Sequence, residues 1–152
     1  MPVCKLADLP GLLIPGSRLI GLDFGTKTIG VAVSDAALRV AAPVTIIRRR
    51  KFSLDMAELA EIAESRNAGG FVVGLPLNMD GTEGPRVQST RDLVAEMLIR
   101  MPLPTAYQDE RMSSQAVERA MIREADLSRA KRKKSIDSAA AAYILQAALD
   151  TF

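Results

Sequence analysis

The sequence predicts an α/β protein of three layers, in which a five-stranded mixed sheet carries helices on both faces. The first two apolar segments, residues 19–23 and 28–34, are joined by a short glycine-containing turn, which is typical of a hairpin. Later apolar segments alternate with segments of helical periodicity, which favours strand–helix units. The chain has 152 residues, of which 48% are hydrophobic and 25% are charged, as expected for one globular domain.

Five segments have the composition of strands. Residues 28–34 are mostly small or β-branched, which is typical of a strand that is buried on both faces. Pro43 cannot donate a ladder hydrogen bond, so it favours an edge position for its strand. Gly25, in the first turn, is free to adopt the positive φ that a tight connection often needs. The predicted strands are residues 19–23, 28–34, 40–47, 71–75 and 103–109.

Four segments are predicted to form helices. Ser53 can cap the first of them, and residues 67–70, Asn-Ala-Gly-Gly, are expected to stop it. Gly84 and Pro85 fit the cap and the first turn of the second helix. The predicted helices are residues 53–65, 85–100, 111–123 and 135–149.

The domain organisation is predicted to be simple. Residues 1–17 contain three prolines and read as an irregular leader rather than a signal peptide, so residues 18–152 are expected to form a single domain. Residues 129–134 read as a mobile basic connector. No apolar run is long enough to span a bilayer, so no membrane is expected. The one cysteine, Cys4, excludes an internal disulfide and favours the reducing cytoplasm.

Histidine is absent from the chain, and this excludes several kinds of site. Catalysis by Ser-His-Asp or Cys-His groups, a histidine general base and most zinc sites all require that residue. The remaining metal ligands are oxygens, which favour Mg²⁺ or Mn²⁺. A metal site in this protein is therefore predicted to consist of carboxylates.

Three acids are the candidate catalytic and metal-binding residues: Asp23, Glu110 and Asp137. Asp23 ends the first strand and Glu110 follows the last, and such strand ends form the functional edge of an α/β sheet. Asp137 shares a helix face with small and apolar residues, which points it toward the sheet. Two divalent ions held by these acids could activate a hydroxide and stabilise the leaving oxygen of a phosphodiester. The predicted reaction is hydrolysis of nucleic acid.

Each acid also has a structural interpretation. Asp23 could be a turn residue, and Glu110 could form a surface ion pair with Arg111. Asp137 could favour a helix N-terminus through the helix dipole. These alternatives remain open from the sequence alone.

Basic residues near the three acids are the candidate contacts to substrate phosphates. They are Lys27, Arg111, Lys131, Arg132, Lys133 and Lys134. The last four could instead form a solvated linker. A second basic run, residues 48–51, is better explained as charge that protects an edge strand. Aromatic residues make up only 4% of the chain, so recognition is expected to use backbone and shape rather than base stacking.

Four motifs, in order, resemble the YqgF/RuvX family of pre-16S rRNA nucleases, earlier described as Holliday-junction-resolvase-like. They are residues 23–35, beginning Asp-Phe-Gly-Thr-Lys, residues 73–84, residues 109–114 and residues 134–140. The resemblance implies a ribonuclease-H-like fold, acids at Asp23, Glu110 and Asp137, and processing of the 5′ end of 16S rRNA during ribosome assembly. The sequence departs from the family at Thr28, where a basic residue is common, and in a leader longer than the family needs.

Three other functions compete with a metal-dependent nuclease acting on structured RNA. The same site could resolve branched DNA, and the sequence does not separate these substrates. The Asp-Phe-Gly-Thr hairpin also resembles a phosphate loop of actin-like ATPases, although 152 residues do not supply the two domains that clasp a nucleotide. The basic runs alone would permit a non-catalytic RNA-binding assembly factor. The expected partners are precursor rRNA, branched DNA or pre-ribosomal particles, and the protein is expected to be a monomer or a homodimer.

Overall fold

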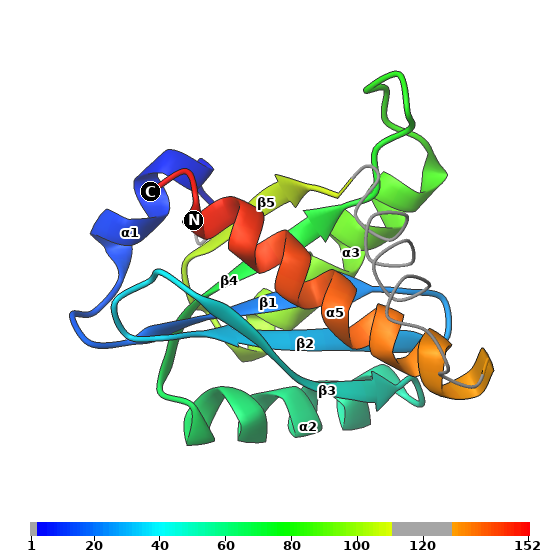
Figure 1. Cartoon of the computed structure of the whole chain (residues 1–152), viewed down its shortest axis with the longest axis horizontal. Helices are drawn as coiled ribbons and strands as arrows, with labels where there is room; N and C mark the ends of the chain where they lie inside the picture. Colours follow the sequence, from blue (N-terminus) through cyan, green and yellow to red (C-terminus); the bar gives the residue numbers. More distant parts are fainter. Residues whose placement is uncertain (1–2, 111–128) are drawn as a thin grey trace.

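The computed structural model describes residues 3–110 and 129–152, and within these the side chains of residues 129–138 are left out. Five strands form one sheet in the order β3-β2-β1-β4-β5 (Figure 1). They are β1 (Arg18–Phe24), β2 (Thr28–Ser34), β3 (Ala41–Arg48), β4 (Ala68–Leu75) and β5 (Thr105–Asp109). The first three strands pair antiparallel, whereas β1, β4 and β5 run parallel. The predicted five-stranded mixed sheet is confirmed, and Pro43 lies in the edge strand β3.

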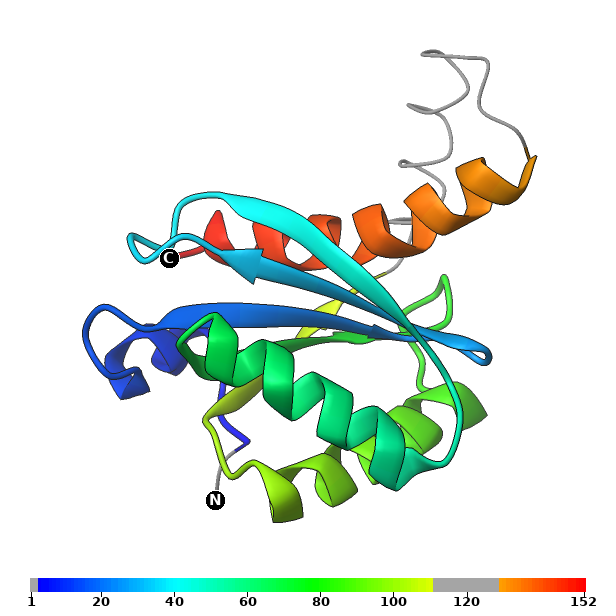
Figure 2. The same cartoon turned by 90° about the horizontal axis from the view of Figure 1, so that it is seen from below.

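Helices cover both faces of this sheet. On one face lie α2 (Phe52–Ser65) and α3 (Pro85–Arg100), and on the other lies α5 (Arg129–Leu149), as Figure 2 shows. The larger core cluster joins Met56 and Leu59 of α2 and Val94 of α3 to the sheet. The smaller cluster joins Ile144 and Leu145 of α5 to the opposite face. The three-layer α/β prediction is therefore confirmed.

The strand at the centre of the molecule, β1, explains how Asp23 reaches the α5 side of the sheet. Ile20 and Leu22 lie in the cluster under α2 and α3, while Leu19 lies in the cluster under α5. Gly21 lets α5 approach closely, because a Cβ there would lie 2.7 Å from Cβ of Leu145. Successive side chains of a strand alternate between faces, so Asp23 continues the row of Leu19 and Gly21.

Two of the predicted turn and cap residues behave differently from expectation. Among the described glycines only Gly16 and Gly81 have positive φ, so Gly25 is not strained in this way. Instead its N–H donates to the Thr28 carbonyl oxygen at 2.8 Å, and a Cβ on Gly25 would lie 3.0 Å from that oxygen. Ser53 is not the cap of α2, since that helix begins at Phe52 and Lys51 precedes it.

Residues 67–70 follow the end of α2 at Ser65, as predicted, but β4 begins three residues before the predicted start of its strand at residue 71. Asn67 makes the turn with a φ of 54°, and β4 begins immediately after it, at Ala68. Gly70 lies against the segment that leads into β5, because a Cβ there would be 2.7 Å from the Pro104 carbonyl oxygen. The glycines that were expected to end the helix therefore also serve close packing inside the strand. By contrast, Gly84 and Pro85 start α3 as predicted.

The first residues of the chain are more ordered than an irregular leader. They form the short helices η1 (Leu6–Asp8) and α1 (Leu9–Leu12). The Cys4 N–H donates to the Thr105 carbonyl oxygen of β5 at 2.8 Å, and Leu9 is fully buried in the cluster under α5. The expectation of irregular structure is wrong for residues 6–12, because an apolar side chain there completes the core.

The basic connector expected at residues 129–134 is also not observed. These residues form the first part of α5, which is 21 residues long. Lysine, arginine and alanine are good helix formers, so a basic composition is compatible with a helix as well as with a linker. The helix predicted at residues 111–123 lies outside the described residues. Within the part of the chain that is described, no helix is both long and apolar enough to cross a membrane.

Candidate active site at the carboxyl ends of the strands

Asp23 and Glu110 lie at the same edge of the sheet, although they are 87 positions apart in the sequence. Asp23 is the last residue but one of β1. The strand β4 lies next to β1 and runs parallel to it, and β5 lies on the far side of β4. Glu110 follows β5 directly, and its N–H donates to the Leu75 carbonyl oxygen at the end of β4, at 3.3 Å. Parallel strands end at one edge of a sheet, and this brings the two carboxyls together.

Gly74 of β4 makes room for Glu110 between the two strands. A Cβ at Gly74 would lie 2.7 Å from Oε2 of Glu110 and 2.5 Å from Cδ1 of Ile144 in α5. The Glu110 side chain therefore lies over β4, on the face that α5 covers. This is also the face to which the alternation of β1 directs Asp23.

The two carboxyls interact directly. Burial raises the pKa of Glu110 to about 8, and the charge of Asp23 and a hydrogen bond with it contribute further. In that hydrogen bond the protonated Glu110 donates and Asp23 accepts. Arg86 acts in the opposite direction and lowers the pKa of Glu110, while Asp109 raises it. Two half-buried acids in contact disfavour simultaneous ionisation unless a cation is present.

The third predicted acid, Asp137, lies in α5 one helical turn before Ala141. Its side chain lies outside the described residues, as do the side chains of Lys131, Arg132, Lys133 and Lys134 and the whole of Arg111. Figure 1 shows the first half of α5 at the side of the molecule where β1 and β2 are joined. Among the described residues, no group of three or more potential ligand side chains could hold a metal ion. The structure therefore brings together two of the three acids and leaves the third as a prediction.

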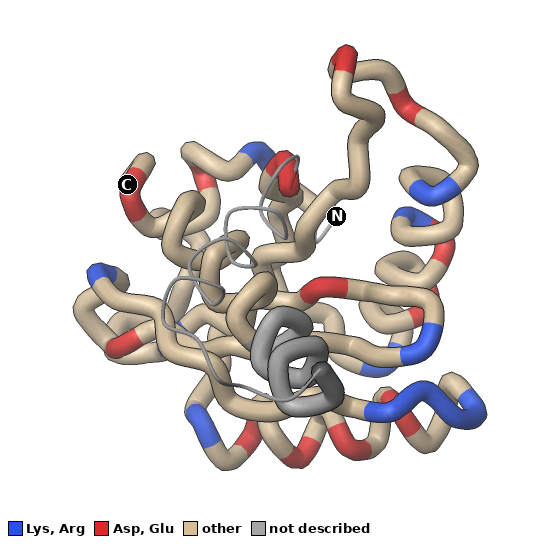
Figure 3. Tube along the Cα trace, turned by 45° about the vertical axis from the view of Figure 1, so that its right-hand side comes forward, with Lys and Arg blue, Asp and Glu red and all other residues tan. Residues whose placement is uncertain are grey.

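The predicted phosphate contact Lys27 lies exposed in the turn between β1 and β2. Its carbonyl oxygen accepts a hydrogen bond of 2.9 Å from the N–H of Arg49, so the basic run 48–51 lies beside the turn. Figure 3 shows this run as a continuous basic stretch after β3. The run is thus close to the carboxyl end of β1.

Sequence reasoning missed Arg86 and Gly74. Arg86 follows Pro85 in the first turn of α3, and its charge reaches Glu110. The sequence offered one indication of Arg86, which is that it directly follows the predicted helix start at Pro85. No sequence signal distinguishes Gly74 from other strand glycines, because its role depends on where the Glu110 side chain lies.

Comparison with known proteins identifies the family. The family described as "RuvX: Holliday junction resolvase" matches residues 17–151. A Rhodospirillum rubrum protein named "Putative pre-16S rRNA nuclease" is 51% identical over 150 residues, which cover 99% of this chain and 93% of that protein. A Phenylobacterium zucineum protein of the same name is 53% identical over 151 residues, covering 99% and 97%. These alignments extend into residues 1–17, so the leader is shared with these relatives.

The solved structures show the fold. Thermus thermophilus RuvC, solved in complex with a Holliday junction substrate, superposes with a TM-score of 0.52 at 13% identity, covering 89% of this chain and 94% of that one. This likeness confirms the ribonuclease-H-like architecture predicted from the sequence. With a family match over most of the chain and full-length relatives at about half identity, the chain belongs to the RuvX family.

Proposed function

We propose that this protein is a metal-dependent nuclease whose catalytic centre includes Asp23 and Glu110. The observation that carries the proposal is their contact at the carboxyl ends of β1 and β5, where burial and the neighbouring Asp23 raise the pKa of Glu110. Perturbed acids in contact at this edge of an α/β sheet are typical of functional sites rather than of packing. The family match supports the same class of reaction.

The residues present fit a divalent cation. Two carboxylates supply hard oxygen ligands, and the chain contains no histidine that would favour zinc. A cation held by Asp23 and Glu110 would displace the proton of Glu110 and relieve the repulsion between the two carboxylate charges. When bound there, Mg²⁺ or Mn²⁺ would activate water and stabilise the charge that develops on the phosphodiester. We propose two ions, with Asp137 as a further ligand.

The roles of the basic residues follow from their proximity to this centre. Lys27, in the turn after Asp23, would contact a substrate phosphate. Arg111, next to Glu110 in sequence, would do the same. Lys131, Arg132, Lys133 and Lys134 occupy the first turns of α5 before Asp137, and they would bind phosphates further from the cut. Position Thr28 lies at the start of β2 and supplies no charge here.

The proposed substrate is precursor 16S rRNA, cut near its 5′ end during ribosome biogenesis. The names of the two relatives, each covering 99% of this chain, support this substrate. A pre-ribosomal particle is then the natural partner. The second candidate is a four-way DNA junction, which is favoured by the description of the family. A purely RNA-binding role is less favoured, because it leaves the half-buried Asp23–Glu110 pair without a purpose.

The experiment that tests the proposal is a cleavage assay on both substrates side by side. Precursor 16S rRNA and a four-way DNA junction are incubated with Mg²⁺, Mn²⁺ or chelator, and the wild type is compared with Asp137→Asn. We expect cleavage of the RNA that requires a divalent ion and is lost in the variant. Preferred cleavage of the junction would show that the substrate is branched DNA. Binding without cleavage under every condition would refute the proposed nuclease activity.

A further inference from the structure

A groove next to the proposed catalytic acids is lined by arginines that neither the motifs nor the comparisons assign. It has a volume of about 420 Å³ and runs between the turn after β1 and the exposed side of α3. Phe24, Gly25 and Thr26 form one wall, so the groove begins one residue beyond Asp23. Arg49 and Arg86 also line it. The groove borders the end of β1 on the α3 side of the sheet, whereas the Asp23 side chain is directed to the α5 side.

Arg49 is held in the groove by the turn itself. Its side-chain Nη1 donates to the Gly25 carbonyl oxygen at 2.8 Å, and its backbone N–H donates to the Lys27 carbonyl oxygen at 2.9 Å. The side chain is half-buried. A guanidinium group has five N–H donors, and the described contact uses one. Arg49 is therefore oriented in advance while most of its donors stay available to a ligand.

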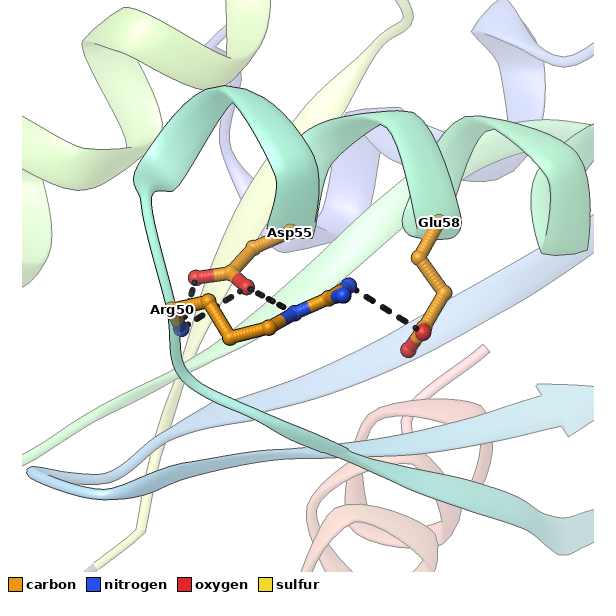
Figure 4. A network of polar contacts seen from close by, with 3 residues as sticks. All are labelled: Arg50, Asp55 and Glu58. Atoms are coloured by element: carbon orange, nitrogen blue, oxygen red, sulfur yellow. Dashed lines mark hydrogen bonds and ion pairs between the residues drawn. The ribbon is translucent and has the colours of Figure 1, made fainter.

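The neighbouring Arg50 shows the contrast within one basic run. It lies between two acids of α2, with its Nε 3.9 Å from Asp55 and its Nη2 3.6 Å from Glu58 (Figure 4). The Arg50 backbone N–H also donates to the buried Asp55 carboxylate, at 3.1 Å. Arg50 thus fixes the start of α2, whereas Arg49 faces the groove. The two neighbouring arginines therefore make different contacts.

Arg86 faces the same groove from α3. It is exposed, and no ion pair joins it to an acid among the described residues. It lines the groove that begins beside Phe24, and its charge counteracts the rise in the pKa of Glu110. Arg91, five residues further along α3, differs because its Nη2 lies 2.6 Å from Glu83. Arg86 therefore places a positive charge close to the proposed reaction centre.

The groove carries acids only at its other end. Asp92 and Glu96 line it six and ten residues after Arg86. At 1.5 Å per residue of helix these lie about 9 Å and about 15 Å along α3 from Arg86. Asp92 accepts a hydrogen bond of 2.9 Å from Gln88, and Glu96 lies 3.8 Å from Arg100. Negative charge there repels a phosphate, so the anion-binding part of the groove is limited to the end near Asp23.

We propose that Arg49 and Arg86 bind a backbone phosphate of the substrate next to the bond that is cut. This inference rests on the proposed nuclease function and deepens it. The ligand class is a phosphodiester of RNA or DNA, since a guanidinium group can donate two hydrogen bonds to phosphate oxygens, and contacts to phosphates carry no sequence information. The groove fixes the register of the strand relative to Asp23 and Glu110.

Binding assays in chelator separate this role from catalysis. The probes are fluorescein-labelled precursor 16S rRNA and a labelled four-way DNA junction, and the dissociation constant is measured at several salt concentrations by anisotropy. All variants are made in a Glu110→Gln background, so an effect of Arg86 on the charge of Glu110 cannot contribute. Arg86→Ala should lower the salt slope of log Kd by about one, because one phosphate contact is lost. Arg49→Lys keeps the charge but loses the paired N–H donors of the guanidinium group. It should therefore weaken binding by about tenfold, with an unchanged salt slope of log Kd.

Two matched controls come from the same elements. Arg91→Ala removes a charge from α3 that is already paired with Glu83, and Arg50→Lys alters the neighbour of Arg49. Both should bind like the background. If the wild type binds and cleaves but Arg86→Ala and Arg49→Lys bind like their controls, the groove assignment is wrong and the nuclease stands. If the wild type neither binds nor cleaves either probe, the proposed function is wrong and this inference fails with it.

Discussion

Gly74 holds a position that the Glu110 carboxylate makes unsuitable for any other residue. The space that a Cβ would occupy lies 2.7 Å from Oε2 of Glu110, well inside van der Waals contact. The Ile144 side chain closes the other side, at 2.5 Å, so neither neighbour can move without disturbing the site or the core. A single missing methyl group thus positions the carboxyl that we propose to be catalytic.

The first prediction concerns Gly74→Ala. The added methyl group should displace Glu110 and overpack α5, so we expect loss of cleavage together with a destabilisation of about 1–3 kcal/mol. Cleavage is measured well below the melting temperature, where circular dichroism shows the variant to be folded. Gly11→Ala is the control, because nothing lies within 4 Å of a Cβ there. Wild-type cleavage by folded Gly74→Ala would show that Glu110 need not lie where the structure places it.

The second prediction concerns the pH dependence of stability without metal. The folded-state pKa of Glu110 is about 8 and its ordinary value is 4.5, so between these pH values only the folded protein keeps the proton. The unfolding free energy should therefore fall as pH rises through this window, by at most about 1.4 kcal/mol per pH unit from this group. Below the window the contribution is constant.

Urea denaturation in chelator from pH 5 to pH 9 measures this effect. Glu110→Gln cannot lose a proton, so its stability relative to the wild type should rise steadily with pH across the window. Parallel stability curves for the two proteins would mean that the carboxyl titrates normally in the fold.

At the scale of elements, the leader and α5 support each other. Leu9 of α1 is fully buried in the cluster formed with α5, whereas Leu12 of the same short helix is 53% exposed. The fold therefore uses residues that the sequence suggested were outside it. Since α5 also carries Asp137, the position of the third acid depends in part on this packing.

The third prediction compares Leu9→Ala with Leu12→Ala. The first leaves a cavity under α5 and should destabilise the protein by about 2–5 kcal/mol, while the second should change stability by less than about 1 kcal/mol. Chemical denaturation measures both. If both substitutions lowered the unfolding free energy equally and only slightly, Leu9 would not contribute to the core as the structure shows.

At the scale of the whole molecule, the sequence predicted what depends on local pattern. Strand alternation, the helix start at Gly84 and Pro85, and the edge position of Pro43 are all encoded within a few residues, and all are confirmed. The meeting of Asp23 and Glu110 was also predictable, because the ends of parallel strands share one edge.

Features that depend on packing between distant segments were not predictable in the same way. The glycine at position 70 resembles a loop residue until Pro104 is seen beside it. Arg49 and Arg50 are adjacent residues of the same type, yet Arg49 lines a groove whereas Arg50 forms an ion pair with Asp55 of α2. The basic start of α5 has the composition of a linker, and only its place at the beginning of a long helix shows otherwise.

The measurement that tests the account most directly is metal-dependent cleavage of precursor 16S rRNA by Asp23→Asn. Asparagine has the size of aspartate but not its charge, so the variant should fold like the wild type and keep its place at the end of β1. We predict that its cleavage in Mg²⁺ or Mn²⁺ falls to the background seen in chelator. Full activity of this folded variant would contradict the proposal that Asp23 and Glu110 together form the catalytic centre.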